Sequence, residues 1–295
     1  MLTLAIPNFN GEGFLPQTLE SLSAQRPHLT WWLQDSCSSD RSAEIAKSFQ
    51  KDGDVITIEK DGGQADGLNR AFRQMGGDIV GYINSDDRLV DGAAQFVCEQ
   101  FSRDPDLDVL YGEVEWIDSA GSVTGHHAGN ISDLAEVLDI YRVWWNRRQW
   151  VQPEVFFRRR VWDRVGEFNT NYHLAFDFEY WVRCFQAGVK VRRVPRVLAQ
   201  FRLHPNQKSS QPGRAADEIR EIVESALSSV SSLDPRHQRR IKTMLAYDRF
   251  QSGAQEWNGQ SSLGLMLLRN PAWLLLPEVR TRVTSACGRR LGITR

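Results

Sequence analysis

Four short apolar runs, each followed by a helical pattern, occupy the first 110 residues and constrain the fold more than any other feature of the chain. A strand that alternates with a helix in this way predicts a parallel, doubly wound sheet covered by helices. Right-handed crossovers would then bring the ends of all four strands to one edge of the sheet. The expected strand and helix pairs are 2–6 with 13–24, 30–33 with 41–49, 55–59 with 65–75, and 79–83 with 92–101.

Polar loops follow all four strands, and open α/β sheets bind their ligands at that edge. The loop after the fourth strand carries Ser85, Asp86 and Asp87. Their carboxylate oxygens suit a hard cation such as Mg²⁺ or Mn²⁺. Taken alone, the tripeptide is equally compatible with an N-cap that places a favourable charge at the start of the next helix.

The chain changes character after about residue 108. The segment 109–116 and the turn at 118–121 predict a strand and hairpin, which would make the sheet mixed. A helix is expected over 177–187, and Gly188 suits its end. Beyond residue 214, the segments 215–229 and 235–250 show helical periodicity.

Composition places the chain among ordinary globular proteins. Of its 295 residues, 41% are hydrophobic and 25% charged, which excludes disordered and fibrous classes. The four cysteines show no paired spacing, so we expect neither a zinc site nor a disulfide framework, and a reducing cytoplasmic setting. The amino terminus lacks the pattern of a cleaved signal, and the apolar stretch 263–276 is interrupted at residues 269–271, so no membrane-spanning helix is predicted.

Charge is unevenly distributed along the chain. Residues 236–295 contain 11 Arg or Lys against 3 Asp or Glu, a local +8, so a net charge of -1 leaves about -9 on the rest. The acidic body disfavours a nucleic-acid partner. The basic carboxyl-terminal helices are compatible with peripheral contact with an anionic membrane, with a protein contact, and with an oligomer interface.

Four motifs lie along the first 90 residues: Pro7-Asn8-Phe9-Asn10, Gln34-Asp35-Ser36, Asp61-Gly62-Gly63-Gln64 with the residues up to Arg70, and Ser85-Asp86-Asp87. In their order and spacing, these motifs resemble those of the family 2 glycosyltransferases, which are inverting enzymes with the GT-A fold. The resemblance covers residues 1–210 and implies a Rossmann-like, mostly parallel mixed sheet flanked by helices. It divides this domain into a nucleotide-sugar-binding half, 1–107, and an acceptor-binding half, 108–210, followed by a helical extension, 211–295.

The resemblance implies a donor-nucleotide site. It assigns Asp35 to the nucleobase imide, with a helix cap as the alternative, and Asp66 to the ribose or base, with a first-turn helix acid as the alternative. Arg70 would reach the phosphates or remain solvated. The residues expected to bind the donor nucleotide are Pro7, Asn8, Asn10, Asp35, Asp66, Arg70, Ser85, Asp86 and Arg202.

The same resemblance implies a metal site and a catalytic base. Asp87 is favoured over Asp86 as the ligand of Mn²⁺ or Mg²⁺, and His204 would be a further ligand of the same ion. Arg202, two residues before His204, would pair with phosphate oxygens. Asp177 lies where the family has its base, although Phe176 stands where many members have Glu. Trp144, Trp145 and Trp150 would either face a sugar or pack in the core.

These expectations combine into a metal-dependent inverting glycosyltransferase. It would move a sugar from a UDP- or dTDP-linked nucleotide-sugar donor to a hydroxyl of a glycan or lipid-linked acceptor, in bacterial surface polysaccharide assembly. The missing Glu before Asp177 keeps a second interpretation open, a noncatalytic nucleotide-sugar-binding or scaffold subunit with the same fold.

Overall fold

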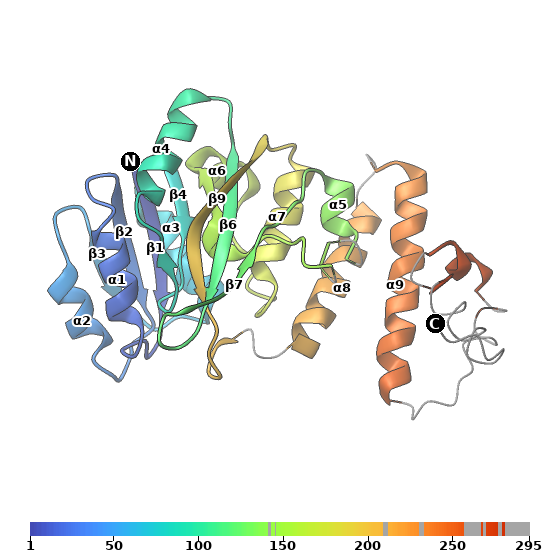
Figure 1. The fold of residues 1–295 in the computed structure, drawn as a ribbon, viewed down its shortest axis with the longest axis horizontal. Coiled ribbons are helices and arrows are strands. Elements are labelled where there is room, and N and C mark those ends of the chain that lie inside the picture. The colour runs from blue at the N-terminus through green and yellow to red at the C-terminus, as the bar shows by residue number, and fades with distance from the viewer. Residues whose placement is uncertain are drawn as a thin grey trace.

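A single sheet covered by helices on both faces forms the body of the protein, with two long helices, α8 and α9, packed beside it (Figure 1). This computed structural model describes residues 1–140, 143–144, 146–208, 212–229, 233–256, 267, 270–276 and 279–280.

The first half of the sheet is parallel, in the order β3-β2-β1-β4, as the alternation of strands and helices predicted. All four strands therefore end at the same edge. The strands are β1 (Leu2–Asn8), β2 (Leu29–Asp35), β3 (Val55–Ile58) and β4 (Ile79–Tyr82), and the helices between and after them are α1 (Leu15–Ser23), α2 (Ser42–Phe49), α3 (Gln64–Gln74) and α4 (Ala93–Arg103).

The second half of the sheet is mixed, which confirms the expected fold class. β8 (Val155–Arg158) pairs antiparallel with β4 and with β6 (Val109–Ile117). β7 (Val123–His127) forms the expected hairpin with β6. β9 (Val191–Arg202) runs parallel to β6 and also pairs with the short β5 (Arg88–Leu89). The pairing of Arg88 with Gln200 brings the end of β9 beside the loop that follows β4.

The remaining helices lie later in the chain, and α8, α9 and η3 are on one side of the body (Figure 1). Gly188 has a φ of +69°, a left-handed conformation that suits the residue after a helix end, as expected for the helix before it. These elements are α5 (Leu134–Leu138), η1 (Gln152–Glu154), α6 (Arg159–Val165), α7 (Phe176–Gln186), α8 (Pro212–Ser229), α9 (Pro235–Glu256) and η3 (Pro271–Leu275).

Two hydrophobic clusters lie on the two faces of the sheet. On β1, Leu4 and Ile6 belong to the cluster under α1 and α4, while Ala5 between them belongs to the cluster under α3, α6 and α7. Alternate residues of a strand point to opposite faces, so this division follows from the strand period of two. Burial on both faces explains why the central strands β1 and β4 are buried along nearly their whole length.

Residues of α8 and α9 belong to the hydrophobic cluster that lies under α3, α6 and α7. Ile222 and Val223 of α8 and Ile241 of α9 are buried with Phe178 and Trp181 of α7. The carboxyl-terminal helices therefore pack on the side of the domain that α7 covers. Within the ranges that the structure describes, no helix is long and apolar enough to span a membrane.

Of the three tryptophans singled out in the sequence, Trp150 is a core residue and Trp144 packs against the core. Trp150 is 5% exposed and contacts Trp181, and Trp144 packs edge-on against Phe178. These contacts favour core packing over sugar binding. Trp145 lies outside the described residues.

Candidate functional site

The loops after β1 and β2 form one hydrogen-bonded unit at the polar edge of the sheet. Asn8 and Asp35 are register partners, and Asn8 Nδ2 donates to Asp35 Oδ2 at 2.6 Å. Ser38 donates from its backbone N to Asp35 Oδ1 at 2.7 Å and from its hydroxyl to Oδ2 at 2.6 Å. Asn10 joins the unit, because its backbone N donates to Ser38 Oγ at 2.8 Å. Pro7 lies in β1 opposite Gln34.

Asp35 is fully buried, with both carboxylate oxygens bonded within these loops. In this conformation Asp35 fixes the shape of the loop. Asn10 supports that shape with a φ of +51°, in the left-handed region that asparagine tolerates.

Asp66 and Arg70, in the first two turns of α3, form an ion pair with each other. Asp66 Oδ2 accepts from the backbone N of Gly62 at 2.9 Å and from Arg70 Nε at 3.1 Å. The Gly62 hydrogen bond lowers the pKa of Asp66. Arg70 also pairs with Glu59. Both side chains thus stabilise the beginning of this helix, the role weighed for Asp66 as a first-turn acid.

The two aspartates after β4 differ sharply in environment. Asp87 is 1% exposed, and its oxygens accept from the Arg202 backbone N at 2.9 Å and from Asn84 Nδ2 at 3.2 Å. Burial, followed by the charge of Asp86, raises the pKa of Asp87 well above its usual value. Asp86 is more accessible, with its side chain 27% exposed, and its Oδ2 lies 2.9 Å from His204 Nε2. Ser85 precedes this pair and is half-buried.

Arg202 holds this loop in place from the end of β9. Its Nε donates to the Asp86 carbonyl at 2.8 Å, and Nη1 donates to the carbonyls of Asp118 and Ser119 at 3.0 and 3.2 Å. Nη2 donates to Gln17 Oε1 at 2.9 Å. The side chain is 1% exposed, so in this conformation the guanidinium is committed to protein oxygens.

Asp177 is the second residue of α7 and is half-buried. Its Oδ1 accepts from the Phe178 backbone N at 2.7 Å, and Oδ2 has no hydrogen-bond partner among the residues that the structure describes. Burial raises the pKa of Asp177 to about 6, against the lowering effects of the Phe178 hydrogen bond and the Lys208 charge. A carboxyl group with this pKa is ionised at neutral pH and still basic enough to accept a proton. Glu179 instead pairs with Arg183 at 2.8 Å.

Tyr82, at the end of β4, is close enough to Asp177 and Asp87 for both charges to act on its hydroxyl. Burial raises the pKa of Tyr82 well above its usual value, and the charges of Asp177 and Asp87 raise it further. Its ring also lies 6.2 Å from that of Phe176 at the start of α7. The structure therefore brings the proposed base to the same edge of the sheet as the aspartate loop.

Sequence reasoning missed a polar chain that crosses this edge. Lys208 Nζ donates to Gln64 Oε1 at 3.0 Å and lies 5.3 Å from the centre of the Phe176 ring. Gln64 Nε2 in turn donates to Asn84 Oδ1 at 2.7 Å. Gln64 belongs to one of the sequence motifs and Asn84 directly precedes another, but neither is charged, and only the fold shows that they meet. Ser209 and Ser210 lie outside the described residues.

Asp86 and His204 are the residues best placed to hold a cation. They present a carboxylate oxygen and an imidazole nitrogen to each other, which is a suitable pair of donor atoms for a divalent metal. In the described part of the chain, no group of three or more His, Cys, Asp or Glu side chains could hold a metal ion. Any cation here would need ligands from a bound molecule or water.

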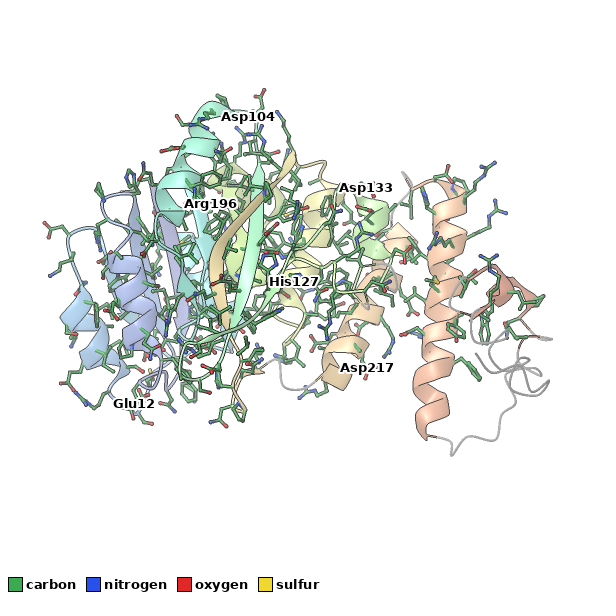
Figure 2. The ribbon with its side chains drawn as sticks, viewed as in Figure 1. Glu12, Asp104, His127, Asp133, Arg196 and Asp217 are labelled. Atoms are coloured by element: carbon green, nitrogen blue, oxygen red, sulfur yellow. The ribbon has the colours of Figure 1, made fainter. Side chains whose placement is uncertain are left out.

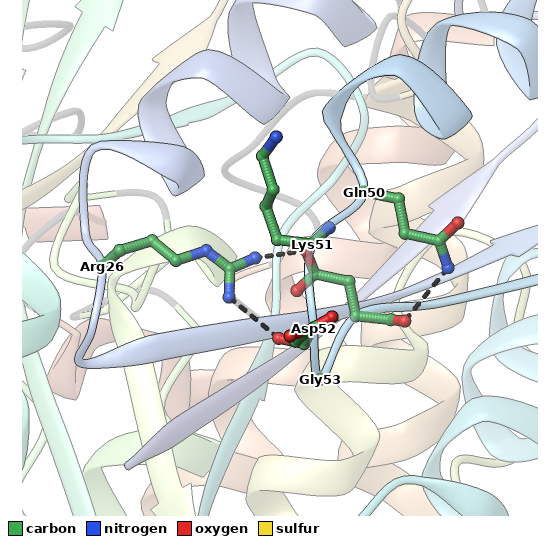
Figure 3. Close-up of a pocket in the computed structure, with 6 residues that line it drawn as sticks. Arg26, Gln50, Lys51, Asp52 and Gly53 are labelled. Carbon is green, nitrogen blue, oxygen red and sulfur yellow. Dashed lines mark hydrogen bonds and ion pairs between the residues drawn. The ribbon is translucent and has the colours of Figure 1, made fainter.

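A polar hollow elsewhere on the protein is lined by Arg26 and by residues 50–54 (Figure 3). Arg26 pairs there with Asp54, and Gln50 donates to the Asp54 carbonyl at 3.1 Å. These residues precede β2 and β3, so the hollow lies at the amino ends of the strands. It is at the opposite edge from the acidic loops and takes no part in the site.

Comparisons with known proteins agree on one class. The model of the family described as glycosyl transferase family 2 matches residues 3–177, more than half of the chain. A protein of Mycobacterium bovis named PGL/p-HBAD biosynthesis glycosyltransferase is 26% identical over 207 residues, which cover 67% of this chain and 75% of that protein.

Solved structures share the fold. The structure of S. aureus TarS 1–349 in complex with UDP-GlcNAc superposes with a TM-score of 0.67, 16% identity, and coverage of 92% of this chain and 78% of that one. A mannosyltransferase of Pyrobaculum calidifontis, in complex with GDP-Man and Mn²⁺, has a TM-score of 0.62, 17% identity, and coverage of 96% and 83%. The fold of this chain is therefore the GT-A fold.

Replacing Arg202 by Met tests its role in holding the aspartate loop. The change removes donors from four protein oxygens and leaves buried acceptors unpaired, so we expect the free energy of unfolding to fall by about 3 kcal/mol or more. Urea denaturation measures the change. The control is Arg41→Met, whose side chain is 72% exposed and which should alter stability by less than about 0.5 kcal/mol. Equal midpoints for the two variants would contradict the assignment.

Proposed function

Because the chain belongs to glycosyl transferase family 2 and is a glycosyl-transfer enzyme, we propose that it is a metal-dependent inverting glycosyltransferase. Its donor would be a UDP- or dTDP-sugar, and its acceptor a hydroxyl of a glycan or lipid-linked glycan in bacterial surface polysaccharide assembly. The observation that carries this proposal is Asp177, a half-buried carboxyl group with a pKa of about 6 beside the acidic loop after β4.

Asp177 would act as the general base. The acceptor hydroxyl attacks the anomeric carbon from the side opposite the diphosphate, its proton passes to Asp177 Oδ2, and the bond from that carbon to the diphosphate oxygen breaks. The nucleoside diphosphate leaves with the electron pair. The Phe178 hydrogen bond on Oδ1 holds the carboxylate in one orientation, which leaves Oδ2 for the proton.

Asp86 and His204 would hold Mn²⁺ or Mg²⁺. We place the metal role on Asp86 rather than on Asp87, because Asp87 is buried and both of its oxygens are bonded, whereas Asp86 faces His204. Two protein ligands fit a cation that completes its coordination with substrate phosphates and water. When bound, such a cation neutralises charge on the departing diphosphate. The Mn²⁺ complex of the Pyrobaculum calidifontis neighbour supports this proposal.

The donor nucleotide would lie over the loops after β1 and β2 and the start of α3. Pro7, Asn8 and Asn10 would form the floor of this site. Asp35 Oδ1 accepts only the Ser38 backbone N–H, so it could accept from a nucleobase imide as well if the loops moved to expose it. The UDP-GlcNAc complex of the S. aureus neighbour supports a uridine nucleotide.

Arg70 and Arg202 are both bonded to protein groups in this conformation. Arg70 would have to leave Asp66 and Glu59 to reach a phosphate, and Arg202 would have to leave four protein oxygens. We therefore place both in support of the donor loops. Peripheral membrane contact would involve the 11 Arg or Lys of residues 236–295, of which five lie outside the described ranges.

Asp177→Asn tests the base. The assay measures the nucleoside diphosphate released from UDP-glucose, UDP-GlcNAc or dTDP-glucose in the presence of Mn²⁺. For the variant, we expect kcat to fall about 10³-fold while the affinity for UDP stays unchanged. For the wild-type protein, kcat should decrease below about pH 6, because the base must be ionised.

The matched control is Glu179→Gln, on the same helix two residues away, where the carboxylate pairs with Arg183. It should retain kcat within about threefold. A wild-type protein that releases no diphosphate from any of these donors, or an Asp177→Asn variant as active as this control, would contradict the proposal.

Mn²⁺ titrations of UDP-saturated protein distinguish the two aspartates. We expect Asp86→Asn and His204→Ala to weaken Mn²⁺ binding by at least about tenfold, because each removes a ligand. Asp87→Asn should change Mn²⁺ affinity by less than about threefold, since its oxygens face Arg202 and Asn84. Calorimetry measures all three. If Asp87→Asn weakened Mn²⁺ binding more than Asp86→Asn did, Asp87 and not Asp86 would be the metal ligand.

A further inference from the structure

A carboxylate from outside the family-matched region reaches the start of the base helix. Glu218 of α8 accepts hydrogen bonds from three consecutive backbone N–H groups that lead into α7. Its Oε1 accepts from His173 at 3.2 Å, and Oε2 accepts from Leu174 and Ala175 at 2.8 Å each. The family match ends at residue 177, so α8 is not part of it.

The start of α7 needs such a partner. Ala175 is its N-cap residue and cannot supply a side-chain oxygen. Backbone N–H groups at a helix start lack partners within the helix, and a negative charge is favourable there. Glu218 satisfies the N–H groups immediately before the helix and places its charge at that end.

We propose that Glu218 is a positioning residue for the transfer reaction. It fixes the backbone of residues 173–175 and thereby sets where α7 presents Asp177 to the acceptor. This inference rests on the proposed role of Asp177 as the base. Through Glu218, α8 would contribute to the geometry of the transfer site.

The packing of α8 gives Glu218 a rigid support. Ile219 and Ile222 lie about one helical turn apart on the same face of α8. They are 4% and 2% exposed, and they belong to the hydrophobic cluster that also contains residues of α7. Arg220 pairs with Asp248 of α9, which braces α8 from its other neighbour. A carboxylate on a packed helix can hold a loop with little loss of conformational freedom, because the helix is already ordered.

Charge also couples Glu218 to Asp177. After burial and the Phe178 hydrogen bond, the Asp177 carboxyl responds to Lys208, which lowers its pKa, and to Glu218, which raises it. Tyr82 faces it from β4 and has a pKa raised well above its usual value, so it stays neutral. Removing the Glu218 charge should therefore lower the pKa of Asp177.

The test compares Glu218→Gln and Glu218→Ala with a matched control, Asp217→Asn. Asp217 is the adjacent carboxylate on α8, is 77% exposed and pairs with Arg220 on its own helix (Figure 2). Three measurements are made on the full chain. They are hydrogen exchange of the amides of residues 173–175, the Asp177 pKa from carboxyl ¹³C NMR assigned with Asp177→Asn, and kcat and KM for UDP-GlcNAc hydrolysis with Mn²⁺.

We expect both Glu218 variants to exchange these amides about tenfold faster than the control. In both, the pKa of Asp177 should fall by about half a unit, and the acid limb of kcat should move to lower pH by the same amount. At pH 8, kcat should fall about tenfold with an unchanged KM, because the base is displaced while the donor loops are not. Thermal melts show whether Glu218→Ala folds, and Glu218→Gln preserves the side-chain volume if it does not.

Exchange rates and an Asp177 pKa equal to those of Asp217→Asn would overturn the inference. So would a loss of kcat with an unmoved acid limb, which would show general destabilisation. The exchange and NMR measurements need no substrate. A wild-type protein that hydrolyses no donor therefore counts against the proposed function, while these two measurements still decide the role of Glu218.

Discussion

The buried contact between Asp87 and Arg202 is the constraint on which the rest of the site depends. It joins two segments 115 residues apart, through the Arg202 backbone N on Asp87 and the guanidinium on the Asp86 carbonyl. The pairing of β5 with β9 makes this contact geometrically available. Because Asp87 is held inside, Asp86 is left at the surface of the edge, where the chain two residues beyond Arg202 brings His204 against it. One buried carboxylate thus orders the loop, and its neighbour is left for chemistry.

Burial separates the roles of the acidic groups. Asp35 and Asp87 are both buried, and hydrogen bonds from neighbouring loops satisfy their oxygens. Asp177 is buried enough to raise its pKa to about 6, yet one of its oxygens has no partner in the described part of the structure. The first arrangement makes a rigid frame, and the second makes a base that works near neutral pH. The same residue type serves both purposes because the surrounding fold differs.

The alternation of strands and helices was enough to predict the parallel half of the sheet and the edge at which its loops gather, since both follow from local periodicity and crossover handedness. Which aspartate of the pair would be buried could not be predicted, because β9, far along the chain, decides it. The sequence likewise could not show that Arg202, expected to contact phosphate, is enclosed by backbone and side-chain oxygens from three other segments. Glu218 lies in an ordinary helical pattern, and only the packing of α8 against α7 reveals its contact.

A crystal structure of the protein with UDP and Mn²⁺, with the metal located by its anomalous signal, tests the central claim most directly. We expect one Mn²⁺ bonded to Asp86 and His204 and to the diphosphate, with Asp87 still bonded to the Arg202 backbone and Asp177 open toward the acceptor side. A Mn²⁺ bonded to Asp87 with His204 turned away, or no metal at this edge at saturating UDP and Mn²⁺, would contradict it.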